Sequence, residues 1–151
     1  MYWASCVALI FLSIAVVTDL KTREIPDWVS LAILAVGILD GWFGGGLACW
    51  NDRLYGLGLA AVGCTALFYL GALGGGDAKL LMALGLVVGW RPLLSILFYT
   101  AVIGGVLSYI AMRKGARDLA YAPAIALGHG LWLLFANFAP SALGMWGSAP
   151  A

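Results

Sequence analysis

The chain has 151 residues, of which 64% are hydrophobic and only 10% are charged, and its formal net charge is +1. Charged residues make up about a quarter of a soluble domain, so the composition excludes a large soluble domain and indicates a polytopic membrane protein. One membrane domain is predicted over residues 1–140, in contact with the lipid bilayer, and residues 141–151 are expected to form a flexible tail. Nothing resembles a basic patch for nucleic acid.

Apolar runs, separated by charges, glycines and prolines, predict an all-α bundle of about six transmembrane helices. In chain order they cover Tyr2–Thr18, Trp28–Phe43, Leu54–Leu73, Ala78–Trp90, Leu93–Met112 and Tyr121–Ala139. The fourth run is short for a span at about 1.5 Å per residue. We therefore expect it either to lie in a thinned or water-filled site or to lengthen through Gly74 to Asp77.

The distribution of basic residues predicts the orientation of this bundle. The loops after the first, third and fifth segments carry six of the eight lysines and arginines, whereas the other two loops carry Arg53 and Arg91. Basic residues concentrate in cytoplasmic loops, so both termini are expected outside. Asp19 and Asp77 then fall on the same, cytoplasmic side.

Asp19 and Asp77 are the candidate catalytic residues. Asp19 closes the first apolar segment, and Asp77 precedes the fourth. An ionisable group at membrane depth is costly and is a functional candidate by default. Two aspartates at the ends of separate helices can share a proton and activate water, as in an aspartic peptidase. Helix position favours Asp77 as the more readily ionised member, because it faces the positive end of its helix dipole and Asp19 faces a negative end.

The residues around Asp77 carry supporting predictions. Gly74, Gly75 and Gly76 are expected to let the backbone turn sharply and a peptide substrate approach closely. Lys79 either tunes the carboxylate pair or contacts substrate, or it extends to the membrane interface. Small residues predict close helix packing at Gly104–Gly105 and along a stripe formed by Gly56, Ala60 and Cys64.

The other polar and sulfur-containing residues are assigned structural roles. His129 is predicted to be a hydrogen-bonded packing residue, and without a Gly-x-Ser-x-Gly elbow a serine mechanism is disfavoured. No metal site or cofactor is expected, because the cysteines lack ligand spacing and are interpreted as small apolar fillers, namely Cys6, Cys49 and Cys64. The remaining aspartates are predicted to be solvated helix caps, with Asp27 as an N-cap, followed by Asp40, Asp52 and Asp118.

Three blocks of sequence resemble a known family. They are Thr18 to Trp28, which includes Ile25-Pro26, then Gly74 to Leu80 with its Gly-x-Gly-Asp motif, and more loosely Tyr121 to Ala126. Together they resemble the type IV prepilin leader peptidases, and most closely the short form of tight-adherence (Flp-type) pilus systems. The resemblance implies that Asp19 and Asp77 are catalytic, that the substrates are pilin precursors with a cytoplasmic basic leader, and that the protein lies in the bacterial inner membrane.

Two departures from the family pattern limit this expectation. Asp27 stands where members commonly have asparagine, and the cysteine-rich insertion of the bifunctional enzymes is absent. We therefore expect peptidase activity without N-methylation of the mature pilin.

Alternative functions stay open. One is another Gly-x-Gly-Asp intramembrane peptidase, such as the archaeal preflagellin type, whereas Ile25-Pro26 and the small size disfavour a presenilin-like enzyme. A proton- or ion-coupled transporter and a scaffold subunit of a secretion machine belong to different classes. The sequence determines neither the oligomeric state nor which pilin precursor is cleaved.

Overall fold

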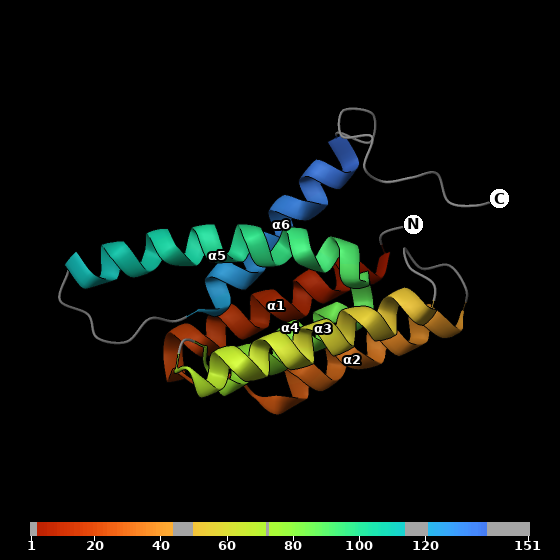
Figure 1. The fold of residues 1–151 in the computed structure, drawn as a ribbon, viewed down its shortest axis with the longest axis horizontal. Helices are drawn as coiled ribbons and strands as arrows, with labels where there is room; N and C mark the ends of the chain where they lie inside the picture. The colour runs from red at the N-terminus through yellow and green to blue at the C-terminus, as the bar shows by residue number, and fades with distance from the viewer. Residues whose placement is uncertain (1–2, 44–49, 72, 114–120, 139–151) are drawn as a thin grey trace.

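The computed structural model describes residues 3–43, 50–71, 73–113 and 121–138. Six helices make up these segments, and no strand occurs in them (Figure 1). The helices are α1 Trp3–Thr22, α2 Asp27–Trp42, α3 Trp50–Tyr69, α4 Gly75–Val88, α5 Trp90–Arg113 and α6 Ala122–Phe138. The prediction of an all-α bundle with six helices is confirmed. The predicted tail lies outside the described residues.

The short helix α4 occupies the centre of the bundle. It contacts each of the other five helices, and most of its residues from Asp77 to Val88 are buried. Helices α1 to α4 run side by side along the long axis, whereas α6 packs on α5 and crosses it obliquely (Figure 1). Helix α4 begins at Gly75 and so carries Asp77 in its first turn, as one of the two alternatives expected. It ends at Val88, however, and with 14 residues it remains short for a span.

Glycines bring α3 and α4 into close contact. A Cβ atom at Gly85 would lie 2.5 Å from the carbonyl oxygen of Gly56, and the next members of the stripe, Ala60 and Cys64, are buried. This confirms the predicted small-residue stripe. On α5 the prediction holds for Gly104, where a Cβ would collide with Tyr121, and is wrong for Gly105, where a Cβ would point into open space.

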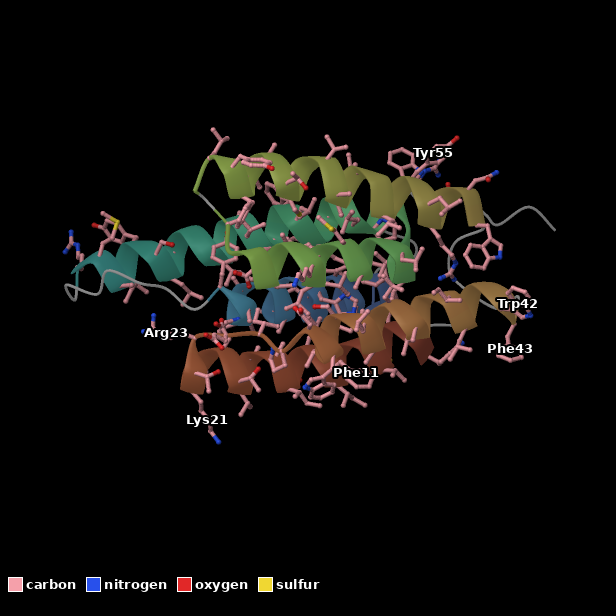
Figure 2. All side chains as sticks on the ribbon, turned by 90° about the horizontal axis from the view of Figure 1, so that it is seen from below. Phe11, Lys21, Arg23, Trp42, Phe43 and Tyr55 are labelled. Carbon is pink, nitrogen blue, oxygen red and sulfur yellow. The ribbon has the colours of Figure 1, made fainter. Side chains whose placement is uncertain are left out.

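The outer surface of the bundle is apolar. Helices α1 and α5 are long and apolar enough to cross a membrane by length and composition, and large side chains such as Ile10, Val62 and Phe98 are exposed. Figure 2 shows Trp42 and Phe43 at one end of the bundle and Lys21 and Arg23 at the other. This distribution is typical of an all-α membrane protein, in which apolar side chains face lipid and aromatic or basic side chains mark the two ends.

A buried ion pair holds the end of the bundle that carries Trp42. Nη2 of Arg53 lies 2.5 Å from Oδ2 of Asp40, and Nη1 donates to three carbonyl oxygens, of Gly37 at 3.2 Å, Leu86 at 3.1 Å and Val87 at 3.2 Å. Arg53 is fully buried. The prediction that Asp40 is a solvated cap is therefore wrong, because a guanidinium from α3 reaches it across the helix interface.

The other structural predictions have mixed outcomes. His129 is confirmed as a packing residue, because its Nε2 hydrogen-bonds with the carbonyl oxygen of Ser5 at 3.0 Å and its ring stacks on Trp132. Cys64 is buried as predicted, whereas Cys6 is exposed. Asp52 is only partly exposed and accepts a hydrogen bond from Nε1 of Trp90 at 3.1 Å, so it is not simply solvated. Cys49 and Asp118 lie outside the described residues.

Candidate active site

Asp19 lies in the last turn of α1, where hydroxyl groups and a left-handed residue end the helix. Thr22 Oγ1 lies within hydrogen-bond distance of two carbonyl oxygens, of Thr18 at 2.9 Å and of Glu24 at 3.2 Å, to either of which it can donate. Arg23 adopts φ of 58° and its N–H donates to the carbonyl oxygen of Asp19 at 3.0 Å. A non-glycine residue in this conformation is uncommon, and here it serves as the αL cap of α1. The chain then turns back towards α2. The Asp19 side chain faces the bundle interior, and the residue is 7% exposed.

The Asp19 carboxylate is held by the first residue of α6. The backbone N–H of Ala122 donates to Oδ2 of Asp19 at 3.1 Å. Ala122 itself is fully buried. One oxygen of Asp19 is thus fixed by a backbone group that is 103 residues away in the sequence.

Asp77 projects from the first turn of α4 and is 8% exposed. Its carboxylate lies within electrostatic range of Asp19 and of the Tyr121 phenol. Oδ1 is buried and has no hydrogen-bond partner in the described part of the chain. The structure therefore brings the two predicted aspartates together, and it adds Tyr121 and Ala122 to their surroundings.

The three glycines before Asp77 have different surroundings. A Cβ at Gly74 would lie 3.0 Å from Oδ2 of Asp77, and one at Gly76 would lie 3.0 Å from Cβ of Ile25. A Cβ at Gly75 would make only an ordinary contact of 3.6 Å with Phe68. The missing side chain at Gly74 thus leaves room for the Asp77 carboxylate, and the missing side chain at Gly76 leaves room for the Ile25-Pro26 loop.

The glycines before Asp77 follow the connection from α3 to α4, but they do not adopt the left-handed conformation that favours glycine. Gly74 has φ of −71° and ψ of 151°, which is extended backbone that any residue adopts. Positive φ occurs among the described glycines at Gly71 and Gly89 instead. Close approach explains Gly74 and Gly76, whereas no described contact requires a glycine at position 75.

Lys79 joins the two sequence blocks at the surface. Its Nζ lies 2.6 Å from Oδ1 of Asp27, and the side chains are 54% and 68% exposed. Asp27 is the first residue of α2 rather than its N-cap, which is Pro26, so the predicted capping role of Asp27 is wrong. The structure thus gives Lys79 a role that the sequence did not predict, an ion pair between α2 and α4.

Sequence reasoning missed the role of α6 at the site. The only local signal was the block Tyr121 to Ala126, in which Pro123 marks the start of a helix. Nothing in that block indicates that the Ala122 amide is directed at Asp19, because this contact depends on how α6 crosses α1. Among the described residues, no cluster of three potential metal ligands occurs.

The fold and the site together define a helical membrane protein with a buried pair of aspartates at one end of its bundle. Residues 6–109, which include both aspartates, match the model of the type IV leader peptidase family. The chain belongs to this family.

Curated relatives include bacterial and archaeal proteins. The prepilin leader peptidase/N-methyltransferase of Pectobacterium carotovorum subsp. carotovorum is 33% identical over 150 residues, covering 90% of this chain and 52% of the relative. The protein of the same name from Bacillus subtilis (strain 168) is 29% identical, covering 86% and 56%. The preflagellin peptidase of Methanocaldococcus jannaschii is 33% identical, covering 69% and 44%. The chain thus spans about half the length of these relatives. No solved structure matches it.

Proposed function

We propose that this protein is a membrane aspartic endopeptidase that removes the basic leader from type IV prepilin precursors of the Flp type. Asp19 and Asp77 are its catalytic pair. The observation that carries the proposal is that two carboxylates from α1 and α4, each less than a tenth exposed, lie within electrostatic range of each other. Among the described residues, neither takes part in an ion pair. Two buried like charges without a counter-charge are costly, so their pairing fits a chemical role better than a structural one.

The two carboxyl groups can perform peptide hydrolysis when they share one proton. Carboxylates held close cannot both ionise at low cost, so they titrate as a pair. The ionised group takes a proton from water as the water attacks the scissile carbonyl, and the protonated group donates to the carbonyl oxygen. The exposed backbone at Gly74 and Gly75 lies directly beside Asp77 and offers a peptide substrate a side from which to approach.

The substrate class follows from relatives and from charge. Two of the relatives above are named as prepilin leader peptidases and one as a preflagellin peptidase, so a prepilin is the first substrate to test and a preflagellin the second. The cytoplasmic orientation rests on the basic side chains at the catalytic end, Lys21 and Arg23 among them. We place the enzyme in the bacterial inner membrane with this end in the cytoplasm, and we limit its activity to the peptidase.

Cleavage in cells tests the proposal directly. The protein is co-expressed with candidate prepilin precursors, and the mature pilin is identified by N-terminal sequencing. We expect loss of the leader with the wild-type protein and with Asp52→Asn, which keeps an acceptor for Trp90 far from the site. We expect none with Asp19→Asn or Asp77→Asn, although both variants remain in the membrane. Substantial cleavage by either of them would refute the assignment of the pair.

Thiol labelling tests the orientation separately. In a background without the native cysteines, Thr22→Cys lies at the catalytic end and Asn51→Cys at the other, and both positions are exposed. A membrane-impermeant reagent added to intact cells should label Asn51→Cys and spare Thr22→Cys until the cells are permeabilised. Labelling in the opposite pattern would place the catalytic end outside.

A further inference from the structure

The first turn of α6 has one backbone donor directed at the catalytic pair. The N–H of Ala124 donates to the carbonyl oxygen of Tyr121 at 3.0 Å, and Pro123 has no N–H to donate. The N–H of Ala122 donates to Oδ2 of Asp19 at 3.1 Å. Since the start of a helix also carries the positive end of its dipole, this carboxylate sits where a negative charge is favoured.

Asp77 also lies at the start of a helix, in the first turn of α4, but one of its carboxylate oxygens lacks a hydrogen-bond donor. Its Oδ1 is buried without a hydrogen-bond partner in the described segments. A buried anion whose oxygen accepts no hydrogen bond is strongly disfavoured relative to the neutral acid. Hydrogen bonding to the charged form, by contrast, favours ionisation. The two carboxylates are therefore similarly buried, at 7% and 8% exposed, but they differ in hydrogen bonding, because Asp19 has a backbone donor and Oδ1 of Asp77 has none among the described residues.

We propose that the N-terminus of α6 fixes where the shared proton resides, so that Asp19 is the base and Asp77 the acid. Ala122 is the positioning residue, and it acts through its backbone N–H. This inference rests on the proposed peptidase function and assigns roles within it. It reverses the order expected from α1 and α4 alone, because the dipole of a third helix acts on Asp19 through a direct hydrogen bond.

The assigned roles give a balanced reaction. As the oxygen of water bonds to the scissile carbonyl carbon, one water proton moves to Asp19 and the Asp77 proton moves to the carbonyl oxygen. In the second step the carbon–nitrogen bond breaks, the Asp19 proton passes to the leaving amine, and a hydroxyl proton of the tetrahedral intermediate returns to Asp77. The pair ends in its starting protonation state, and no other reactant is consumed.

Other ionisable groups face this end of the bundle from the neighbouring elements. The Tyr121 phenol, before α6, is within electrostatic range of Asp77. Lys79 on α4 is paired with Asp27 on α2 at the surface. Exposed charges on α1 and the loop after it belong to Lys21, which points away from the bundle (Figure 2), and to Arg23 and Glu24. On the other described elements, Asp40 of α2, Asp52 and Arg53 of α3 and Arg91 of α5 lie at the opposite end of the bundle, whereas Arg113 ends α5 on the side of the catalytic pair (Figure 1). The buried ring of His129 lies within α6.

Carbon NMR of the wild-type protein reads the proton distribution without perturbing it. Aspartate labelled at Cγ with ¹³C gives a resonance whose position differs between the acid and the carboxylate, and the spectra of Asp19→Asn and Asp77→Asn assign the two signals. At the pH of maximal cleavage we expect the Asp77 signal at the position of an acid and the Asp19 signal at that of a carboxylate. The reverse order, or equal sharing between them, would overturn the proposal.

Replacing a single amide tests the role of α6. Lactic acid in place of Ala122 substitutes an ester oxygen for the N–H and keeps the methyl side chain. Because the ionised form of Asp19 loses its donor, we expect cleavage to fall about 10- to 100-fold at neutral pH and the acidic limb of the rate–pH profile to move up by about one unit. The matched control is lactic acid at Ala124, which removes an amide of the same turn that bonds Tyr121 instead.

The control separates chemistry from helix stability. The Ala124 ester should leave the acidic limb in place even if it lowers the melting temperature in detergent. An equal shift in both esters, or none in the Ala122 ester, would contradict the positioning role.

If the wild-type protein cleaves precursor while the labelled carboxyl signals appear in reverse order, the proton assignment fails and the peptidase stands. If the wild-type protein cleaves no precursor, the proposed function itself fails.

Discussion

The two ends of the bundle each bury a pair of ionisable side chains, and the pairs are built in opposite ways. At the end that carries Trp42, Arg53 and Asp40 are of opposite charge, 2.5 Å apart, and the guanidinium also binds three carbonyl oxygens. At the other end, Asp19 and Asp77 are of like charge, and one oxygen of Asp77 has no partner among the described residues. The first pair joins helices and neutralises its charges, although Oδ1 of Asp40 is also buried without a hydrogen-bond partner among the described residues. The second pair has no counter-charge among the described residues.

The difference shows how burial is to be interpreted in this molecule. Burial alone does not distinguish the pairs, since all four side chains are less than a tenth exposed. Unpartnered oxygens do not distinguish them either, since Asp40 and Asp77 each have one among the described residues. What distinguishes them is whether a counter-charge compensates the lost hydration. A compensated buried charge stabilises a packing arrangement, and an uncompensated one is a candidate for chemistry.

The largest effect is expected at the catalytic pair. Asp19→Asn and Asp77→Asn should each lower the rate of cleavage by about 10²- to 10⁴-fold, and the double variant should be no slower than either single one, because the two groups act as a unit. The single-turnover rate in detergent measures this. Additive losses in the double variant would indicate two independent carboxylates and would contradict the claim that Asp19 and Asp77 act as a coupled pair.

At the other end the loss should appear in stability. Arg53→Met leaves Asp40 buried without its partner and should lower the free energy of unfolding by about 3–5 kcal/mol, whereas Arg53→Met combined with Asp40→Leu should recover most of the loss. Reversible unfolding in lipid measures both, with the exposed Arg91→Met as control. Per folded molecule, cleavage should change less than about twofold. A large loss of rate in folded protein would mean that the ends are coupled.

The glycines before Asp77 should give an intermediate and graded effect. Gly74→Ala places a methyl group against Oδ2 of Asp77, and Gly76→Ala places one against Ile25, both at 3.0 Å. We expect each to slow cleavage by about tenfold or more, since small displacements of reacting groups are costly. Gly75→Ala is the matched control and should stay within about threefold. Equal sensitivity at all three positions would favour a role in backbone conformation over close approach.

The smallest effect is expected at the exposed pair of Lys79 and Asp27. Surface ion pairs contribute about 0–1 kcal/mol and are screened by salt. Lys79→Gln and Asp27→Asn should each change the cleavage rate by less than about threefold, and the difference from wild type should shrink as the salt concentration rises. Lys21→Gln, another exposed lysine at this end, is the control. A loss of more than tenfold at Lys79 alone would point to substrate contact rather than to pairing with Asp27.

The sequence by itself determined the class of protein, the six helices and the two aspartates at helix ends. These features depend on composition and on local patterns, because an apolar run forms a helix in lipid whatever its neighbours are. The Gly-x-Gly-Asp motif likewise marks its aspartate without knowledge of the fold. Close packing along α3 was likewise predictable from the spacing of Gly56, Ala60 and Cys64, whereas the sequence did not identify α4 as its partner.

Only the tertiary structure decided which polar groups meet. Asp40 looked like Asp27 and Asp52 in sequence, yet Arg53 from the next helix turns it into a buried partner. The amide of Ala122 reaches Asp19 from 103 residues away, and no local pattern encodes the direction of a backbone N–H relative to a distant helix. The identity of the proposed catalytic residues is thus a local property of the sequence, whereas the compensation of buried charges is set by helix packing, which brings donors and counter-charges from distant segments.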